Sequence, residues 1–172
     1  KKYVYIDMKP ENIMTIIENN NIIKIIDFGL AEKYILLNQH RENLKKKGFS
    51  GTPLYSSISV MQGYTSSRRD DIESLGYLLL YLIRGGILPW NQMSIQDIFV
   101  CKLNYNFCEK KENIAREIVL YARNLEYEIK PDYELLRQIL NTNNSKFCRA
   151  KTKKGKPSKN LSKINGFCHL HK

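Results

Sequence analysis

Residues 7–29 read Asp-Met-Lys-Pro-Glu-Asn-Ile-Met-Thr-Ile-Ile-Glu-Asn-Asn-Asn-Ile-Ile-Lys-Ile-Ile-Asp-Phe-Gly. Two short apolar runs, 13–17 and 22–26, are joined by the polar residues 18–21. Runs rich in β-branched residues on either side of a short Asn-rich turn predict a buried β-hairpin. Polar and charged residues precede the first run and follow the second. We therefore expect the hairpin to bring these two polar groups together.

Working outward, the polar stretch Glu32–Ser50 lacks periodicity and is predicted to be a long loop. Ser67 and Asp70 form a capping-box-like start for a helix over 71–84, which is apolar on nearly every face and ends at Gly85-Gly86. We expect this helix to be buried all round. Further helices are predicted from Ser94 to Leu103, over 112–125, and from Pro131 as first residue to about Leu140. The fold class is mainly α with a small β-hairpin element.

The composition is that of an ordinary globular protein. The 172 residues are 42% hydrophobic and 26% charged, which excludes disorder throughout. The longest uncharged apolar stretch, 74–83, has ten residues, whereas a bilayer span needs roughly 20. No membrane span and no secretory signal are therefore expected, and the location is predicted to be cytoplasmic or nuclear. The four cysteines lack paired C-x-x-C spacing and are predicted to be reduced thiols.

The net charge of +11 is unevenly distributed. Residues 146–172 hold nine Lys or Arg and no acidic residue, which leaves a net charge of only +2 on residues 1–145. Two parts follow: a body, 1–145, large enough to bury a core, and a basic, flexible tail, 146–172. A lysine cluster without interleaved aromatic residues supports only non-specific, salt-sensitive contact with nucleic acid. The basic composition of the tail is explained equally well by a nuclear-import signal or by a solvated segment.

The polar groups at the ends of the predicted hairpin suit phosphoryl transfer. Asn12 and Asp27 offer the hard oxygen ligands that Mg²⁺ prefers. Lys9 offers a cation for developing phosphate charge, and Asp7 offers an acceptor for the proton of an attacking hydroxyl. The pattern D-x-K-P-x-N arises by chance about once per 10⁵ windows, so its coincidence with a following D-F-G is informative.

These residues resemble the catalytic and metal-binding loops of eukaryotic protein kinases, whose signatures are H-R-D-x-x-x-x-N and D-F-G. Lysine at position 9 is similar to the serine/threonine kinases rather than the tyrosine kinases. Within that group the chain resembles casein kinase 1. The stretches that carry this closer resemblance are 25–34, 51–59, 67–77 and 130–138. The resemblance implies the C-terminal lobe of a kinase over residues 1–145.

The resemblance also implies roles for single residues. Asp7 would be the catalytic base, Lys9 the contact to the γ-phosphate of ATP, and Asn12 and Asp27 the Mg²⁺ ligands. Thr52 matches a position that hydrogen-bonds near the catalytic Asp and Lys. Asp71 matches the residue that holds the backbone of the catalytic loop. The expected cofactors are ATP and Mg²⁺, and the expected partners are protein substrates, including acidic or pre-phosphorylated ones.

The sequence departs from the family pattern at three places. Only six residues precede Asp7, so we expect the chain to be a piece of a longer protein that lacks the nucleotide-covering lobe and to be weak or inactive alone. Tyr5-Ile6 replace the family's His-Arg, so an intact form is expected not to depend on activation-loop phosphorylation. Leu54 replaces an arginine of the family's pocket for acidic substrates, for which Arg41 or Lys45-Lys46-Lys47 could compensate.

Two other functions remain open on the sequence alone. The first is a non-catalytic kinase fragment, or pseudokinase, that acts as a protein-binding module. The second is a nucleic-acid-binding protein that acts through its basic tail. The presence of Asp7, Lys9, Asn12 and Asp27 together favours the enzyme over both.

Overall fold

Helix α2, Arg68–Ile83, is the longest helix of the computed structural model, which describes residues 2–16, 22–46 and 48–144. The chain divides into two units, Lys1–Pro131 and Asp132–Lys172, each described by itself below. The predicted tail, 146–172, lies outside the described residues, and so do Cys148 and Cys168.

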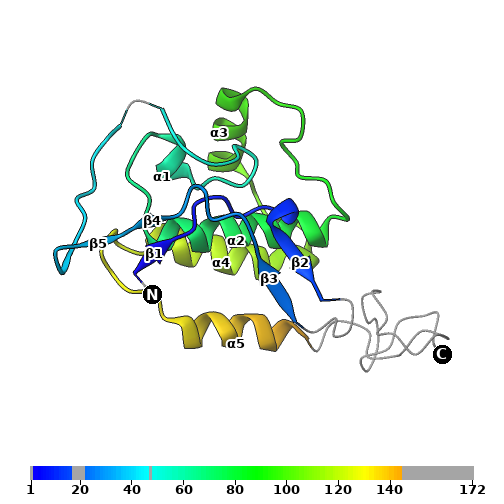
Figure 1. The fold of residues 1–172 in the computed structure, drawn as a ribbon. Coiled ribbons are helices and arrows are strands. Elements are labelled where there is room, and N and C mark those ends of the chain that lie inside the picture. Colours follow the sequence, from blue (N-terminus) through cyan, green and yellow to red (C-terminus); the bar gives the residue numbers. More distant parts are fainter. Residues whose placement is uncertain (1, 17–21, 47, 145–172) are drawn as a thin grey trace, which may run out of the picture. The chain divides into compact units, whose positions relative to one another are not determined.

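The described residues form five α-helices and three small antiparallel strand pairs, in agreement with a mainly helical fold (Figure 1). The helices of the first unit are α1 (Ile58–Met61), α2, α3 (Ile95–Asn104) and α4 (Asn113–Asn124), with short 3-10 helices at Pro10–Asn12 and Lys110–Glu112. The strands are β1 (Tyr3–Val4), β2 (Ile13–Thr15), β3 (Ile23–Ile25), β4 (Glu32–Lys33), β5 (Ile35–Leu36) and β6 (Gln39–His40). None of the described helices combines the length and the apolar character needed to cross a bilayer.

The capping box predicted at the start of α2 is confirmed. The Asp70 carboxylate accepts the Ser67 backbone N–H at 2.7 Å and the Ser57 hydroxyl at 2.6 Å. At the other end, Gly85 and Gly86 have φ of 78° and 96°, as expected of a glycine stop. The expectation of burial all round is wrong near this end, where Leu82 is 60% exposed.

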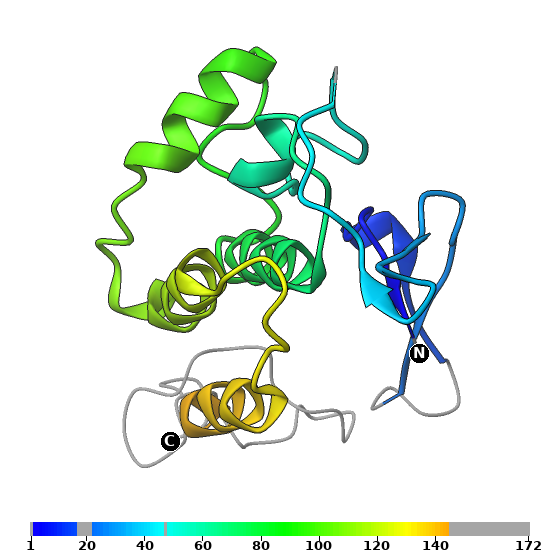
Figure 2. The ribbon, with the colours of Figure 1, turned by 90° about the vertical axis from the view of Figure 1, so that its left-hand side faces the viewer.

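The hydrophobic core lies where α2 meets α4 and the segment after α2. Helices α2 and α4 lie side by side in Figures 1 and 2. Edge-to-face contacts join Trp90 to Tyr77 at 5.2 Å and to Tyr105 at 5.6 Å between ring centroids. The buried members of this core are Tyr55, Tyr77, Leu80, Leu88, Trp90, Ile98, Ala115 and Val119. The core therefore joins the helices to the segment around Tyr55, which borders the site described below.

Gly76 sets the distance between α2 and α4, so replacing it by Ala is expected to destabilise the fold by about 1–3 kcal/mol. An added Cβ would lie 2.5 Å from Val119 Cγ2 and 3.3 Å from the Val119 backbone nitrogen. The measurement is urea unfolding of Gly76→Ala, with Val119→Ala and the double variant to show that the two substitutions are coupled. A variant more stable than the wild type, as helix propensity alone predicts, would contradict this account.

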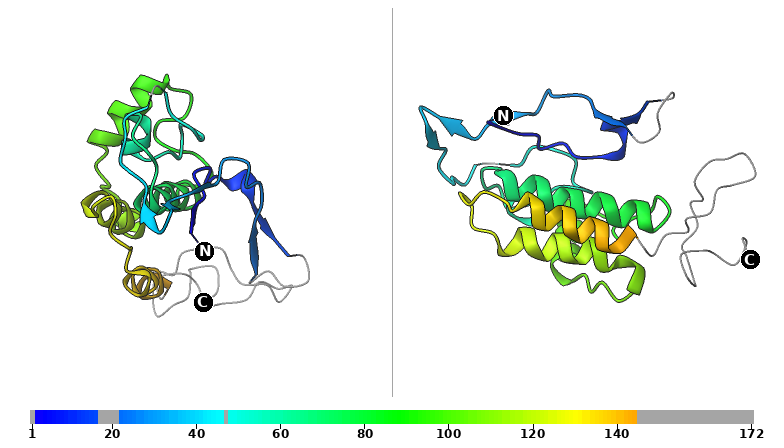
Figure 3. Two further views of the ribbon diagram at one scale, coloured as in Figure 1. Left: turned by 60° about the vertical axis from the view of Figure 1, so that its left-hand side comes forward. Right: turned by 90° about the horizontal axis from the view of Figure 1, so that it is seen from below.

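The predicted hairpin is confirmed as strands β2 and β3, but its predicted burial is wrong. Ile13 faces Ile25 and Thr15 faces Ile23 in the antiparallel register. The side chains of Ile23 and Ile25 are 61% and 41% exposed. In Figure 3 the hairpin extends away from α2. Apolar composition predicted a core position, but the side chains of this strand pair are largely exposed.

The stretch Glu32–Ser50, predicted to be a loop, contains strands β4, β5 and β6. Strand β4 pairs with β1, and β5 pairs with β6 across a turn in which Leu37 and Asn38 have positive φ. Two-residue strands carry too few positions to show a period of two, which is why the sequence did not reveal them. The later part of the stretch is held by Thr65, whose backbone N–H donates to the Leu44 carbonyl at 2.9 Å.

The predictions for the later helices are largely confirmed. Helix α3 begins after Ser94, whose hydroxyl accepts the Asp97 N–H at 3.2 Å, and α4 matches the predicted 112–125 closely. In the second unit, α5 spans Tyr133–Asn144, so Pro131 is not its first residue and the helix continues beyond Leu140. The reason is the Asp132 carboxylate, which accepts the N–H groups of Glu134 and Leu135 and caps the helix itself.

Candidate active site

The predicted site residues Asp7, Lys9, Asn12 and Thr52 meet around one buried carboxylate. Asp7 Oδ2 accepts a hydrogen bond from Lys9 Nζ at 2.5 Å and from Asn12 Nδ2 at 3.1 Å. Asp7 Oδ1 accepts one from the Thr52 hydroxyl at 2.7 Å. Thr52 is distant in sequence from the other three, so the fold itself assembles this cluster. We call these four residues the Asp7 cluster.

The Asp7 cluster keeps its carboxylate ionised. Burial opposes the charge, but hydrogen bonds from Lys9, Thr52 and Asn12 outweigh it and hold the pKa of Asp7 below its usual value. The hydrogen bond to Asp7 raises the pKa of Lys9 in turn, which keeps that side chain cationic. A carboxylate has about four lone-pair sites, so Asp7 retains capacity for a further donor.

Asp71 on helix α2 holds the backbone just before Asp7. The Asp71 carboxylate accepts the backbone N–H groups of Tyr5 and Ile6 at 2.7 and 2.8 Å. Ile6 has φ of 73°, a conformation that is unfavourable for a β-branched residue. The role expected for Asp71 in holding this backbone is thus confirmed. Burial raises the pKa of Asp71 to about 6 despite these two bonds.

Asn12 directly precedes β2 and Asp27 follows β3, so the two residues flank the two open ends of the β2–β3 hairpin. The Ile26 backbone N–H donates to the Asn12 carbonyl at 3.0 Å and joins the two ends. Asp27 is exposed, has φ of 56°, and accepts the Gly29 N–H at 3.1 Å. Since Asn12 uses its amide nitrogen on Asp7, its amide oxygen is the atom suited to a metal. Carboxylate and amide oxygens are both ligands of the hard-oxygen kind that Mg²⁺ prefers.

The sequence marked Tyr5 only as a departure from the His-Arg pair of the resembling family and did not predict a role for it. The structure places Tyr5 in the site. Its hydroxyl donates to the Ile26 carbonyl, next to Asp27. Its ring meets that of Phe28 edge-on at 5.5 Å between centroids. Burial raises the pKa of Tyr5, so the hydroxyl stays protonated and keeps this bond at neutral pH. Tyr5 therefore links the loop that carries Asp7 to the segment that carries Asp27.

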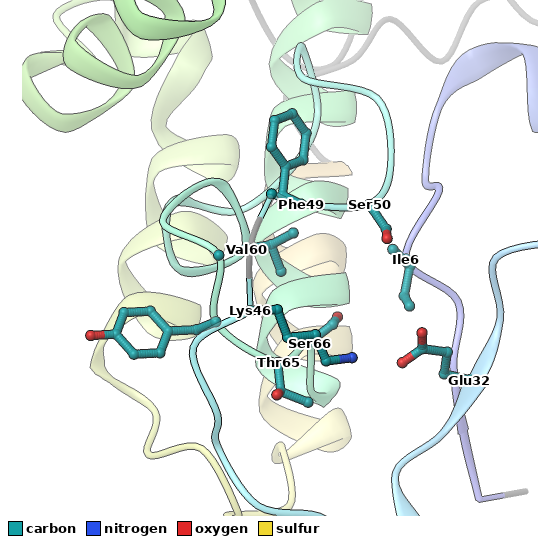
Figure 4. Close-up of a pocket in the computed structure, with 11 residues that line it drawn as sticks. Ile6, Glu32, Lys46, Phe49, Ser50, Val60, Thr65 and Ser66 are labelled. Atoms are coloured by element: carbon teal, nitrogen blue, oxygen red, sulfur yellow. The ribbon is translucent and has the colours of Figure 1, made fainter.

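A cavity of about 110 Å³ lies beside Ile6, the residue before Asp7. Figure 4 shows Ile6 and Glu32 on one side of it and Val60 and Ser66 on the other. Arg41 forms an ion pair with Glu32 and also donates to the Ser66 carbonyl. Arg41 is therefore engaged within the protein, and it is not the free cation that would replace the arginine missing at Leu54.

The described part of the chain gives no support to a His/Cys metal site or to a disulfide. No cluster of His, Cys, Asp and Glu with the makings of a metal site occurs there, and Cys101 and Cys108 are free thiols. A comparison with known protein families identifies the class of the chain. The protein kinase domain family matches residues 1–155. The chain therefore belongs to the protein kinase family, whose activity is phosphotransfer.

Proposed function

We propose that the chain supplies the catalytic lobe of a casein kinase 1-like serine/threonine protein kinase, which transfers the γ-phosphate of ATP to protein hydroxyls. The single observation that carries the proposal is the Asp7 cluster: an ionised carboxylate bound at once by Lys9, Asn12 and Thr52. Family membership supports the reaction class. The casein kinase 1 assignment and the choice of Ser and Thr rest on the sequence stretches that resemble that group.

In this proposal Asp7 acts on the attacking hydroxyl. The substrate hydroxyl donates to Asp7, which accepts its proton as the oxygen bonds to the γ-phosphorus and ADP leaves. Lys9, held against Asp7 at 2.5 Å, places a positive charge where the transferred phosphate gains negative charge. Thr52 orients the carboxylate from its other side. Each contact fixes a group that would otherwise have to be ordered during the reaction.

Asn12 and Asp27 are the residues proposed to hold Mg²⁺. The metal, when bound with ATP, would neutralise phosphate charge and orient the leaving group. Asn12 is buried at 4% exposure and so is fixed in place, whereas Asp27 is exposed and open to a ligand. The exposed apolar side chains of Met14, Ile25 and Ile26 adjoin these ligands on the hairpin.

The preference for acidic or pre-phosphorylated substrates is proposed to depend on Lys45 and Lys46. Both are exposed, and neither is used in an ion pair among the described residues. Lys45 Nζ lies over the ring of Tyr64 at 5.7 Å. Arg41 is excluded from this role by its pairing with Glu32. Lys47, the third lysine of the run, lies outside the described residues.

The proposal is tested by phosphate transfer from radiolabelled ATP to an acidic protein, measured with Mg²⁺ and with EDTA. Transfer onto Ser or Thr that requires the metal is expected. Labelling confined to Tyr, or transfer that continues in EDTA, would contradict it. Because the chain alone is expected to be weak, absence of transfer both by the folded chain and by an upstream-extended form would favour the non-catalytic binding module instead.

Replacing Asp27 by Asn is expected to weaken divalent-cation binding in the presence of ATP at least tenfold, since a charged oxygen ligand is lost. Because Asp27 is exposed, the free energy of unfolding should change little. Mn²⁺, observed by electron paramagnetic resonance, is a suitable probe because it shares the oxygen preference of Mg²⁺. The matched control is Asp97→Asn, an exposed carboxylate on α3. Equal Mn²⁺ affinity in the two variants would remove Asp27 from the site.

A further inference from the structure

The side chain of Lys102, on α3, lies inside the protein and is only 1% exposed. Its ammonium nitrogen donates to the carbonyl oxygens of Pro53 at 2.8 Å and Ser56 at 2.6 Å. The same nitrogen lies 4.3 Å from the ring centroid of Tyr77 and 5.4 Å from that of Trp90. Lysine is almost never fully buried unless its charge is paired. Here backbone carbonyls and aromatic faces take the place of a carboxylate.

The two carbonyls that Lys102 binds belong to the turn that follows Thr52. The Thr52 carbonyl accepts the backbone N–H groups of Tyr55 and Ser56, both at 3.0 Å. The Thr52 hydroxyl donates to Asp7 Oδ1 at 2.7 Å. Lys102 is therefore connected to the Asp7 carboxylate in three steps. It binds carbonyls of the turn, the turn is closed by bonds to the Thr52 carbonyl, and the Thr52 hydroxyl binds Asp7.

Trp90 binds the same turn, but through a single hydrogen bond. Its Nε1 donates one hydrogen bond, to the Leu54 carbonyl at 2.9 Å. Lys102 donates to carbonyls on either side of Leu54 and so spans the turn. While Lys102 is protonated, its bonds are also charge-assisted, which makes each about twice as strong as a neutral one. Lys102 is thus the principal side-chain restraint on this turn.

We propose that Lys102 is a positioning residue, which fixes the turn over Pro53–Ser56 and thereby holds the Thr52 hydroxyl on Asp7. Its consequence for catalysis rests on the proposed function, whereas its effect on the turn does not. Lys102 donates to no member of the Asp7 cluster itself and acts through Thr52. The proposal thus assigns a role in the site to a residue of α3.

The charged and titratable groups that face Lys102 come from three helices. They are Glu73 and Tyr77 on α2, Arg123 on α4, and Cys101 on α3 itself. Glu73 Oε1 accepts the Tyr77 hydroxyl at 2.6 Å and Arg123 Nε at 3.1 Å. This carboxylate is therefore already neutralised by an ion pair, and it leaves the Lys102 ammonium to the carbonyls of the turn.

Burial lowers the pKa of Lys102 to about 7, against the opposing charge of Glu73. In the unfolded chain a lysine has a pKa of about 10.4. Between these values the unfolded state binds more protons, so stability rises as the pH increases from about 7 to about 10. Lys102 should change the unfolding equilibrium constant by up to about tenfold per pH unit there.

Hydrogen exchange on the full chain tests the restraint directly. In Lys102→Met, which has a similar length and no donor, the amides of Tyr55 and Ser56 should exchange at least tenfold faster relative to amides in the middle of α2. Lys102→Arg keeps donors and should retain most of that protection. The control is Arg84→Met, which removes a cation from the buried Glu112. It should lower overall stability without selectively exposing Tyr55 and Ser56.

Wild-type protection of Tyr55 and Ser56 in Lys102→Met would overturn the proposal. If the Met variant does not fold, Lys102→Gln takes its place in the exchange experiment, and wild-type protection of Tyr55 and Ser56 there would overturn the proposal. Lys102→Arg tests the charge of Lys102 separately, because an arginine cannot lose its proton. Its stability should lack the rise between pH 7 and pH 9 that the wild type shows. An identical pH dependence in the two proteins would mean that Lys102 keeps its proton throughout this range, so that its bonds to the turn stay charge-assisted.

The catalytic consequence is read from kinetics. Lys102→Met should lower kcat at least tenfold with the KM for ATP unchanged, and Arg84→Met should change neither. An unchanged kcat in Lys102→Met, with a wild type that transfers phosphate, would overturn the positioning role. Absence of transfer by the wild type and by an upstream-extended form would instead contradict the proposed function, and the exchange experiment would still decide whether Lys102 orders the turn.

Discussion

Asp7→Asn is expected to lower the rate of phosphate transfer by about 10²–10⁴-fold, the usual contribution of a general base. Asparagine can accept the hydrogen bond from Thr52 and has the same shape, but it cannot take a proton from the attacking hydroxyl. The loss should therefore fall on kcat, while the KM for ATP stays close to that of the wild type. Initial rates with an acidic protein substrate measure both.

Asp97→Asn is the matched control for this variant, because it makes the same chemical change on the exposed start of α3. It should transfer phosphate at the wild-type rate. Both variants are first compared with the wild type by thermal unfolding, so that a folding defect is recognised. If Asp7→Asn keeps the wild-type kcat, Asp7 is not the base, and the proposed mechanism fails at its central residue.

Asp71→Ala is expected to destabilise the protein by about 2–5 kcal/mol. The substitution leaves the backbone N–H groups of Tyr5 and Ile6 without their acceptor, and each unsatisfied buried donor costs about 1–3 kcal/mol. Ile6 should then leave its positive φ, because nothing compensates the strain. Phosphate transfer should fall together with stability, since Asp7 directly follows Ile6.

The comparison for Asp71→Ala is Asp97→Ala, since both aspartates lie in the first turn of a helix. Asp97 is exposed and binds only the neighbouring Ser94 hydroxyl in the described structure, so its loss should cost about 1 kcal/mol or less. Urea unfolding measures both. Equal losses would show that Asp71 acts only as a helix-start residue and does not hold the catalytic loop.

Local signals in the sequence predicted the elements that depend on neighbouring residues. The hairpin, the capping box at Ser67 and the start of α3 all follow from side chains within a few positions. The Asp7 cluster was predicted in part, because Asp7, Lys9 and Asn12 lie together in sequence. The contact of Thr52 with Asp7 came only through resemblance, since no spacing rule joins residues so far apart.

The predictions that failed depended on tertiary surroundings. An Ile-rich hairpin was expected to be buried, but burial requires a covering element that composition does not reveal. Pro131 was expected to begin a helix, yet the side chain of Asp132 provides the cap one residue later. Lys102 gave no signal at all, because a lysine on an amphipathic helix ordinarily lies on the exposed face.

In concentrated solution, the hairpin β2–β3 is a place where copies of the chain can adhere to one another. It is a two-stranded sheet, so each strand has an outer edge free of described neighbours, and Lys24 is the lone charge on β3. Unpaired strand edges and exposed apolar side chains both promote aggregation. A ligand or polypeptide that covers the hairpin would thus raise the solubility of the protein, apart from anything it contributes to catalysis.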